Sequence, residues 1–228
     1  MSLSSVNLPR RLLGELIGSS FLSAVVIGSG IAAQQLSPGN VGLELLENAL
    51  VTGAGLYVLI LIFGPLSGAH FNPVVSFVNA AIGGMSWFAA ALYVPVQVVG
   101  CILGALVANV MFSLRVVSMS THHRASGPHL FAEAVATTGL ILVIFALSRN
   151  GHHAHTPAAV GAYIAAAYFF TSSTSFANPA ITVGRIFSNT FAGIAPASVP
   201  GFILAELVGG GVALGLVLYL FPTIKEPS

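Results

Sequence analysis

Long apolar stretches separated by short polar connections recur along the whole chain. Six of them have about the 20 residues that an α-helix needs to cross the hydrocarbon core of a bilayer. They lie at residues 12–33, 44–64, 87–112, 129–148, 157–174 and 199–221. The pattern therefore predicts an all-α membrane protein with six transmembrane helices.

Two further apolar stretches, 72–82 and 178–191, are too short to cross a bilayer. Each begins with an Asn-Pro pair, in SGAHFNPVVSFV and in SFANPAITVGRI. A bilayer tolerates irregular backbone next to such a segment only where it is buried in protein or lines a water-filled cavity. We therefore expect two re-entrant half-helices that begin inside the protein.

Similar polar residues recur in the two halves of the chain. LLGELIGSS, which contains Glu15, matches LFAEAVATTG, which contains Glu133. PVQVVG around Gln97 matches LAELVG around Glu206. Each half contains two spans, a half-helix and a third span, so the second half must enter from the opposite side of the membrane. This predicts an inverted repeat with its site near the midplane.

The boundaries of this repeat follow from the polar connection in the middle of the chain. We expect a first repeat at 1–114, an external connecting loop at 115–128 and a second repeat at 129–228. Positively charged residues favour the cytoplasmic side. Arg10, Arg11, Arg149 and Lys225 fall on one side of the predicted membrane, and Arg115 and Arg124 fall on the other. We therefore expect both termini to be cytoplasmic.

Each Asn-Pro pair has the chemistry of a helix start. Asn caps a helix with its side-chain oxygen and Pro is favoured at the first helical position, so Asn72-Pro73 and Asn178-Pro179 each predict an N-terminus. The capping oxygen leaves the side-chain NH2 as a donor beside the positive end of the helix dipole. Two such tips meeting inside an inverted repeat favour neutral solutes that carry oxygen and oppose protons and cations.

The residues before each tip cannot be helical if the helix begins at the asparagine. Their carbonyl oxygens are then free to replace the hydration of a passing solute. We expect this carbonyl ladder to involve Gly68, Ala69, His70, Thr174, Ser175 and Phe176.

Composition supports these predictions and excludes other classes of protein. The 228 residues include only 7 Lys plus Arg and 6 Asp plus Glu, while 56% are hydrophobic. This is far from the charge content of a soluble domain. The net charge of +1 offers no basic face for nucleic acid. The spans contain no convergent nucleophile and base and no metal-ligand set, so we expect no enzyme, cofactor or bound metal.

Polar residues outside the spans are expected to be solvated and without function. His122, His123 and Arg124 lie in the connecting loop, and His152, His153 and His155 lie in the loop at 149–157. The alternatives for the second group are a gate that responds to protonation, since histidine titrates near neutral pH, and a metal site. A membrane scaffold is the alternative class for the whole chain, although its short loops offer little surface for one.

The chain resembles the aquaporins, which form the major intrinsic protein family of water and small-solute channels. The resemblance covers essentially the whole sequence and rests on SGAHFNPV, SFANPA and the paired Glu15 and Glu133. It implies passive transport without a cofactor and a homotetramer with one pore in each subunit. It also implies that both glutamates accept hydrogen bonds from the buried loops that lead to the half-helices.

Two positions depart from the family pattern in the Asn-Pro boxes. The first box ends with Val74 where the family usually has alanine, so we expect its side chain to narrow or dry the centre of the pore. The second box, Asn178-Pro179-Ala180, is followed by Ile181 where the family usually has its filter arginine. Arg185 lies one turn further along. It is either a substitute cation barrier or a partner of a buried carbonyl or interface group.

The resemblance also assigns the other filter positions. Counting from the two boxes gives Thr52 and Ser175, while the fifth-span position is Tyr168 or Ala166, of which we prefer Tyr168. Together with Ile181, this ring implies an entrance wider and less polar than that of a water-only pore.

The ring also bears on the solute. The glycerol-conducting branch typically has Asp where this chain has Thr182, which argues against glycerol as the main solute. Similar arginine-displaced filters occur in bacterial channels that admit arsenite, antimonite and methylated arsenicals. This similarity implies a location in a bacterial inner membrane.

Overall fold

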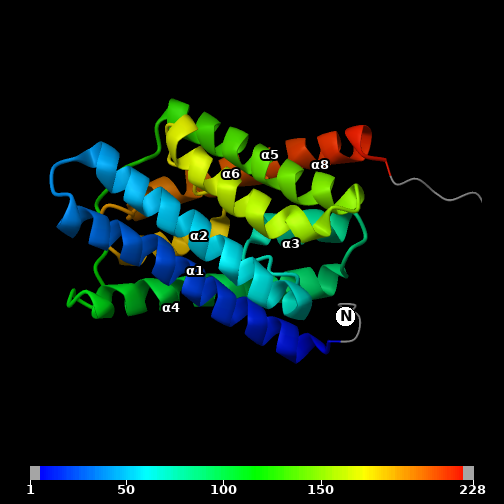
Figure 1. The fold of residues 1–228 in the computed structure, drawn as a ribbon, viewed down its shortest axis with the longest axis horizontal. Helices are drawn as coiled ribbons and strands as arrows, with labels where there is room; N and C mark the ends of the chain where they lie inside the picture. The colour runs from blue at the N-terminus through cyan, green and yellow to red at the C-terminus, as the bar shows by residue number, and fades with distance from the viewer. Residues whose placement is uncertain (1–5, 223–228) are drawn as a thin grey trace, which may run out of the picture.

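The computed structural model describes residues 6–222, and this part of the chain contains helices and no strands (Figure 1). The eight α-helices are α1 Leu8–Leu36, α2 Val41–Ser67, α3 Pro73–Ala81, α4 Trp87–Met111, α5 Gly127–Arg149, α6 Thr156–Phe170, α7 Pro179–Gly184 and α8 Val199–Leu220. Short 3-10 turns lie at His153–His155, Arg185–Phe187 and Pro196–Ser198. The prediction of an all-α membrane protein is confirmed.

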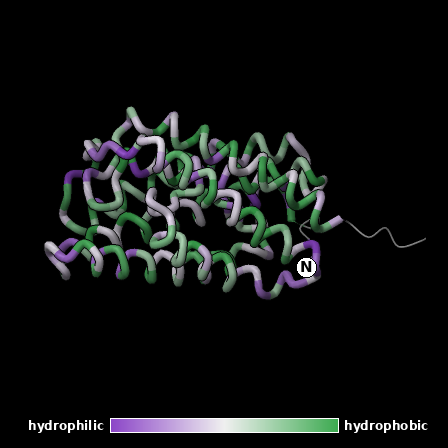
Figure 2. Tube along the Cα trace, turned by 90° about the horizontal axis from the view of Figure 1, so that it is seen from above, coloured by the Kyte–Doolittle hydropathy of each residue, from purple (hydrophilic) through white to green (hydrophobic). Residues whose placement is uncertain are grey.

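Five of the long helices, α1, α2, α4, α5 and α8, are long and apolar enough to cross a membrane. The sixth, α6, has 15 residues and ends at Phe170 rather than at the expected residue 174. It ends there because Thr171 is extended and the chain then runs irregularly to Asn178. In Figure 2 the hydrophilic segments lie mainly toward the two ends of the molecule.

The helices approach one another most closely where glycine removes the side chain. α1 packs on α4, and α5 packs on α8. A Cβ on Gly100 of α4 would lie 2.5 Å from the carbonyl oxygen of Leu16 in α1. A Cβ on Gly209 of α8 would lie 2.4 Å from the carbonyl oxygen of Ala134 in α5. These two contacts correspond to each other in the two halves of the chain. The inverted repeat itself, with its division at 114 and 129, remains a prediction.

The short helices α3 and α7 begin inside the bundle and pack against each other and against α4 and α8. Asn72 and Asn178 cap them, as predicted. The second half-helix is shorter than the predicted 178–191. It ends after the 3-10 turn because Ser188 is extended and its hydroxyl donates to the side chain of Asn109, 2.7 Å away.

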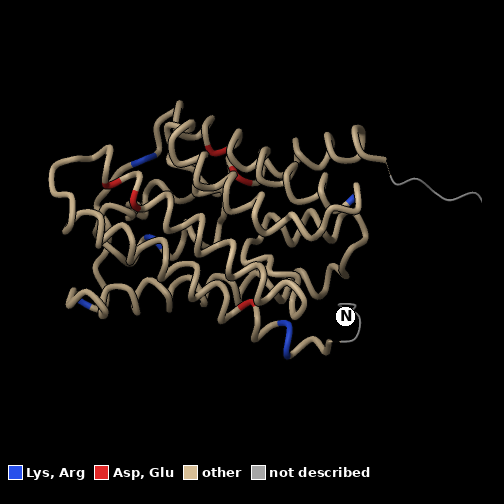
Figure 3. Tube along the Cα trace, in the orientation of Figure 1, with Lys and Arg blue, Asp and Glu red and all other residues tan. Residues whose placement is uncertain are grey.

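Charged residues are sparse along the fold (Figure 3). The two described ends of the chain lie at the same end of the molecule, which an even number of crossings requires (Figure 1). Lys225, which contributes to the predicted orientation, lies outside the described residues.

Candidate functional site

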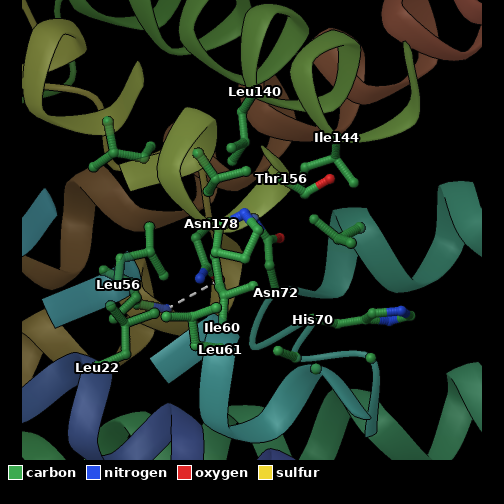
Figure 4. Close-up of a pocket in the computed structure, with 18 of the residues that line it drawn as sticks. Leu22, Leu56, Ile60, Leu61, His70, Asn72, Leu140, Ile144, Thr156 and Asn178 are labelled. Carbon is green, nitrogen blue, oxygen red and sulfur yellow. Dashed lines mark hydrogen bonds between the residues drawn. The ribbon is translucent and has the colours of Figure 1, made fainter. Parts of the chain in front are cut away.

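One cavity of about 690 Å³ contains both Asn-Pro tips. Figure 4 shows the side chains of Asn72 and Asn178 close together between apolar side chains. The predicted site residues that line this cavity are Thr52, Gly68, Ala69, His70, Asn72, Tyr168, Ser175, Phe176, Asn178, Ile181 and Arg185. Six predicted pore residues are not among its lining residues: Pro73, Val74, Thr174, Pro179, Ala180 and the alternative filter residue Ala166.

The two asparagines tie the tips together across the cavity. Nδ2 of Asn72 donates to the carbonyl oxygen of Ala177, 2.7 Å away, and Nδ2 of Asn178 donates to that of Phe71, 2.8 Å away. Each side-chain oxygen accepts from its own helix, as a cap does. An amide nitrogen carries two hydrogens. Each asparagine thus donates one N–H of its side chain to the opposite segment, and its second N–H is free to donate to a solute.

The segments before the tips adopt an unusual backbone. Ala69 and Phe71 before the first tip, and Ser175 and Ala177 before the second, all have φ between 48° and 51°. This left-handed region is uncommon for residues other than glycine and costs on the order of 1–3 kcal/mol for each. No sequence signal marks these four residues. The matching strain in both segments means that the surrounding structure holds them in place.

Glu15 supplies this support in the first segment. Its Oε1 accepts from the hydroxyl of Ser67 at 2.6 Å and from the backbone N–H of His70 at 3.0 Å. Its Oε2 accepts from the N–H of Phe71 at 2.7 Å and from Nε2 of Gln97 at 2.8 Å. The carboxylate therefore fixes the last two peptide groups before the tip.

Glu133 has the corresponding place in the second segment. Its two oxygens accept from the N–H groups of Phe176 at 2.9 Å and Ala177 at 2.7 Å. Glu206 adds a contact that sequence reasoning missed, because its Oε1 accepts from the N–H of Asn178 at 3.1 Å and from the hydroxyl of Thr182 at 2.7 Å. The repeat of Gln97 as Glu206 in the sequence was the signal that could have indicated this role.

Four predicted filter residues meet on the cavity wall. The hydroxyls of Thr52 and Tyr168 lie 3.2 Å apart, in hydrogen-bonding distance. Ser175 and Ile181 line the same cavity. Ala166 is exposed instead, so the geometry favours Tyr168 as the fifth-span residue of this ring.

Val74 does not narrow the pore, and that expectation is wrong. Its side chain packs with Ile141, Phe145 and other residues of a buried cluster and lies over Gly210 of α8. Residue 74 is the second of the helix, and its Cβ points away from the tip toward α8. The first box therefore differs from the family pattern in how it packs and not in what it presents to a solute.

The contact between Val74 and Gly210 predicts that a substitution at one residue can compensate for a substitution at the other. A Cβ at residue 210 would lie 2.4 Å from Cγ1 of Val74, so Gly210→Ala is expected to destabilise the protein by about 1–3 kcal/mol. Val74→Ala removes the clash, so the double variant is expected to regain stability, as measured by thermal unfolding in detergent. A double variant no more stable than Gly210→Ala would contradict this contact. Val74→Ala alone is expected to leave solute selectivity unchanged.

Arg185 is buried and lines the cavity, with 2% of its surface exposed. Its Nε donates to the carbonyl oxygen of Ala192, and its guanidinium carbon lies 3.4 Å from the ring centroid of Phe176. The expected pairing with a buried carbonyl is therefore present. The same side chain nevertheless lies at the cavity, which is where a cation barrier has to be.

Arg124 is not simply solvated, contrary to expectation. Its Nε donates to the carbonyl oxygen of Gly193 and its Nη2 donates to that of Phe191, both at 2.8 Å. Its guanidinium carbon lies 5.6 Å from the Phe176 ring centroid. Burial and the nearby guanidinium lower the pKa of His122 in the same loop. His153 is exposed, as expected, and also lines one end of the cavity.

Comparisons with known proteins agree on one family. The family model described as Major intrinsic protein matches residues 2–177. The chain is 46% identical over 226 residues to aquaglyceroporin AqpS of Rhizobium meliloti (strain 1021), covering 97% of this chain and 96% of that protein. It is 30% identical over 246 residues to the lens fiber major intrinsic protein of Homo sapiens, covering 99% and 87%.

A solved structure supports the same fold. The X-ray structure of the aquaglyceroporin from Plasmodium falciparum superposes with a TM-score of 0.72 at 20% identity, covering 92% of this chain and 96% of that one.

Proposed function

This chain belongs to the major intrinsic protein family, and from that premise we propose that it passes neutral solutes larger than water as well as water itself. The family consists of channels for water and small solutes, so the chain is a channel and not an enzyme. The observation that carries the finer proposal is the apolar side chain of Ile181 on the cavity wall, at the position where the family usually has its filter arginine.

The filter composition supports passage of larger solutes. Thr52, Tyr168 and Ser175 offer hydroxyl groups to the cavity, whereas Ile181 contributes only an apolar surface. A guanidinium at residue 181 would fill part of this space and bind water strongly. Without it, a solute with several hydroxyl groups can exchange its hydration for the wall hydroxyls and pack its carbon or metalloid centre against Ile181.

Arg185 is our candidate for the cation barrier. Its Nε donates to the carbonyl oxygen of Ala192, and a neutral carbonyl does not neutralise the charge. A buried positive group on the wall of a pore repels cations, and with the two helix tips it opposes protons as well. We assign to Arg185 the charge that residue 181 lacks.

The solute class follows from size and neutrality. Trivalent metalloid hydroxides such as arsenite and antimonite, trivalent methylated arsenicals and small polyols are all neutral, oxygen-bearing molecules of suitable size. The relative AqpS is named an aquaglyceroporin, which supports a polyol or a solute of similar shape. Thr182 does not line the cavity and binds Glu206, so its difference from the glycerol-branch Asp does not act directly on a solute.

We further propose the membrane arrangement that the family implies. The chain forms a homotetramer with one pore per subunit, lies in a bacterial inner membrane and has both termini in the cytoplasm. Its partners are lipid and small neutral solutes, and it uses no cofactor. Chemical crosslinking in membranes tests the tetramer, and protease access to tagged termini tests the orientation.

Flux of several solutes in one preparation tests the proposed selectivity. Purified protein in liposomes is exposed to osmotic steps of glycerol, urea and an impermeant sugar, and arsenite uptake is measured in parallel. We expect water, glycerol and arsenite to cross well above the rate of protein-free liposomes, with no added proton conductance. Fast water movement with lipid-like rates for every other solute would contradict the wide-filter proposal. Lipid-like rates for water as well would favour a scaffold.

A further inference from the structure

The connecting loop between α4 and α5 folds back onto the half-helix of the pore. The N–H groups of Ser118 and Ser120 donate to the carbonyl oxygens of Phe187 and Ile186, and Ala195 N–H donates to that of His122. These bonds bind the loop along residues 186–195. The loop therefore forms part of the wall around the end of α7.

Arg124 and Arg185 contact the same part of this wall, which consists of residues 191–193 and the ring of Phe176. Three consecutive carbonyl oxygens accept from the two guanidiniums: Phe191 and Gly193 accept from Arg124, and Ala192 accepts from Arg185. Both guanidiniums also lie within 6 Å of the Phe176 ring centroid, where the face of an aromatic ring attracts a cation. The position of each guanidinium is thus coupled to the other through the same chain segment and the same ring.

Arg124 is the more firmly held of the two. Besides its two side-chain bonds, its backbone N–H donates to the hydroxyl of Ser198 at 2.9 Å. Two divergent donors reaching carbonyls two residues apart require the planar fork of a guanidinium. Arg124 therefore fixes the shape of the segment 191–193, and with it the acceptor of Arg185.

Arg185 is placed to act at the filter. It lies four residues after Ile181, so the two side chains project from the same face of the turn that α7 begins. A helical side chain also leans toward the N-terminus of its helix. The guanidinium lies on the ring of Phe176, which lines the same cavity as Ile181.

We propose that Arg124 is a positioning residue of the pore, which through Phe176 and the carbonyls of 191–193 holds the Arg185 guanidinium at the filter. Arg124 thereby sets the discrimination between water and larger solutes and the exclusion of cations, although it is not itself a residue of the cavity wall. The proposal rests on the barrier role assigned above to Arg185.

A double-mutant cycle tests the proposal. Its main readout, the glycerol-to-water permeability ratio, does not depend on the amount of protein in the liposomes. We measure the glycerol-to-water permeability ratio and the proton leak of liposomes for Arg185→Gln, Arg124→Gln and the double variant. Arg185→Gln is expected to raise the ratio by about tenfold, because it shortens a side chain on the cavity wall. Arg124→Gln is expected to change both readouts in the same direction but less. The double variant is expected to match Arg185→Gln, since Arg124 acts through it.

Two further variants separate position from charge and from general damage. Arg124→Lys keeps the charge but loses the fork, so it is expected to resemble Arg124→Gln. Arg115→Gln changes an exposed arginine of the same loop and is expected to match the unmodified protein. If Arg124→Gln fails to fold, the glycerol-to-water permeability ratio of Arg124→Lys decides whether Arg124 positions Arg185.

The outcomes distinguish the two proposals. An unchanged ratio and proton leak in Arg185→Gln would remove the barrier role itself. A changed Arg185→Gln with an unchanged ratio in Arg124→Gln or Arg124→Lys would overturn only the positioning role. A double variant whose effect equals the sum of the single effects would also overturn it, because Arg124 would then act independently of Arg185.

Discussion

Glu15→Ala is expected to reduce water and solute flux to the level of protein-free liposomes. The carboxylate accepts four hydrogen bonds, from Ser67, His70, Phe71 and Gln97, and its own side chain is fully buried. Each buried donor left without an acceptor costs about 1–3 kcal/mol. The backbone N–H donors among them belong to the segment before Asn72, in which the left-handed residues Ala69 and Phe71 already cost free energy. We therefore expect the N-terminus of α3 to leave its position when the carboxylate is removed.

The replacement Glu15→Gln separates charge from geometry. Glutamine keeps the size of the side chain, but one of its two acceptor oxygens becomes an NH2 donor, which would face other donors. We expect a flux between that of the unmodified protein and that of Glu15→Ala. Glu47→Ala is a matched control, because Glu47 is only partly buried and accepts from Ser37 near the start of α2. Unimpaired water flux in Glu15→Ala would show that the segment holds its shape without this carboxylate.

The features predicted well from sequence are those that depend on local chemistry. Asparagine followed by proline specifies a helix start by itself, so Asn72 and Asn178 are found as caps where the pattern placed them. The long apolar stretches likewise specify helices. Glu15 and Glu133 stand out because a carboxyl group in an apolar span needs a partner inside the protein.

The features that sequence did not predict depend on which way a side chain or peptide group points. Val74 is adjacent to a pore residue in sequence but turns toward Gly210, because one residue along a helix rotates the side chain by about 100°. Arg124 lies in a loop, and its contacts with Phe191 and Gly193 depend on how that loop folds back. The left-handed residues Phe71 and Ala177 are held by hydrogen bonds from their N–H groups to Glu15 and Glu133, which are tertiary contacts that no local pattern records.

Ile181→Arg is expected to convert the pore toward a water-only filter. Residue 181 lines the cavity with Thr52, Tyr168 and Ser175, so a guanidinium there would occupy the space that a polyol or metalloid hydroxide needs. We expect the permeability to glycerol and arsenite to fall by about tenfold or more, whereas that to water falls less. Stopped-flow light scattering for water and glycerol, with arsenite uptake in the same liposomes, measures the change.

The neighbouring Arg185 makes this test sharper. Two guanidiniums one turn apart repel each other, so Ile181→Arg alone is expected to destabilise the protein. Combining it with Arg185→Gln removes the repulsion and is expected to restore stability while keeping glycerol flux low. Ile181→Leu keeps the apolar surface and is expected to leave the glycerol-to-water ratio unchanged. If Ile181→Arg carries glycerol as fast as the unmodified protein while water flux shows that it is folded, the narrowest point lies elsewhere. The presence of isoleucine rather than arginine at residue 181 would then not determine which solutes pass.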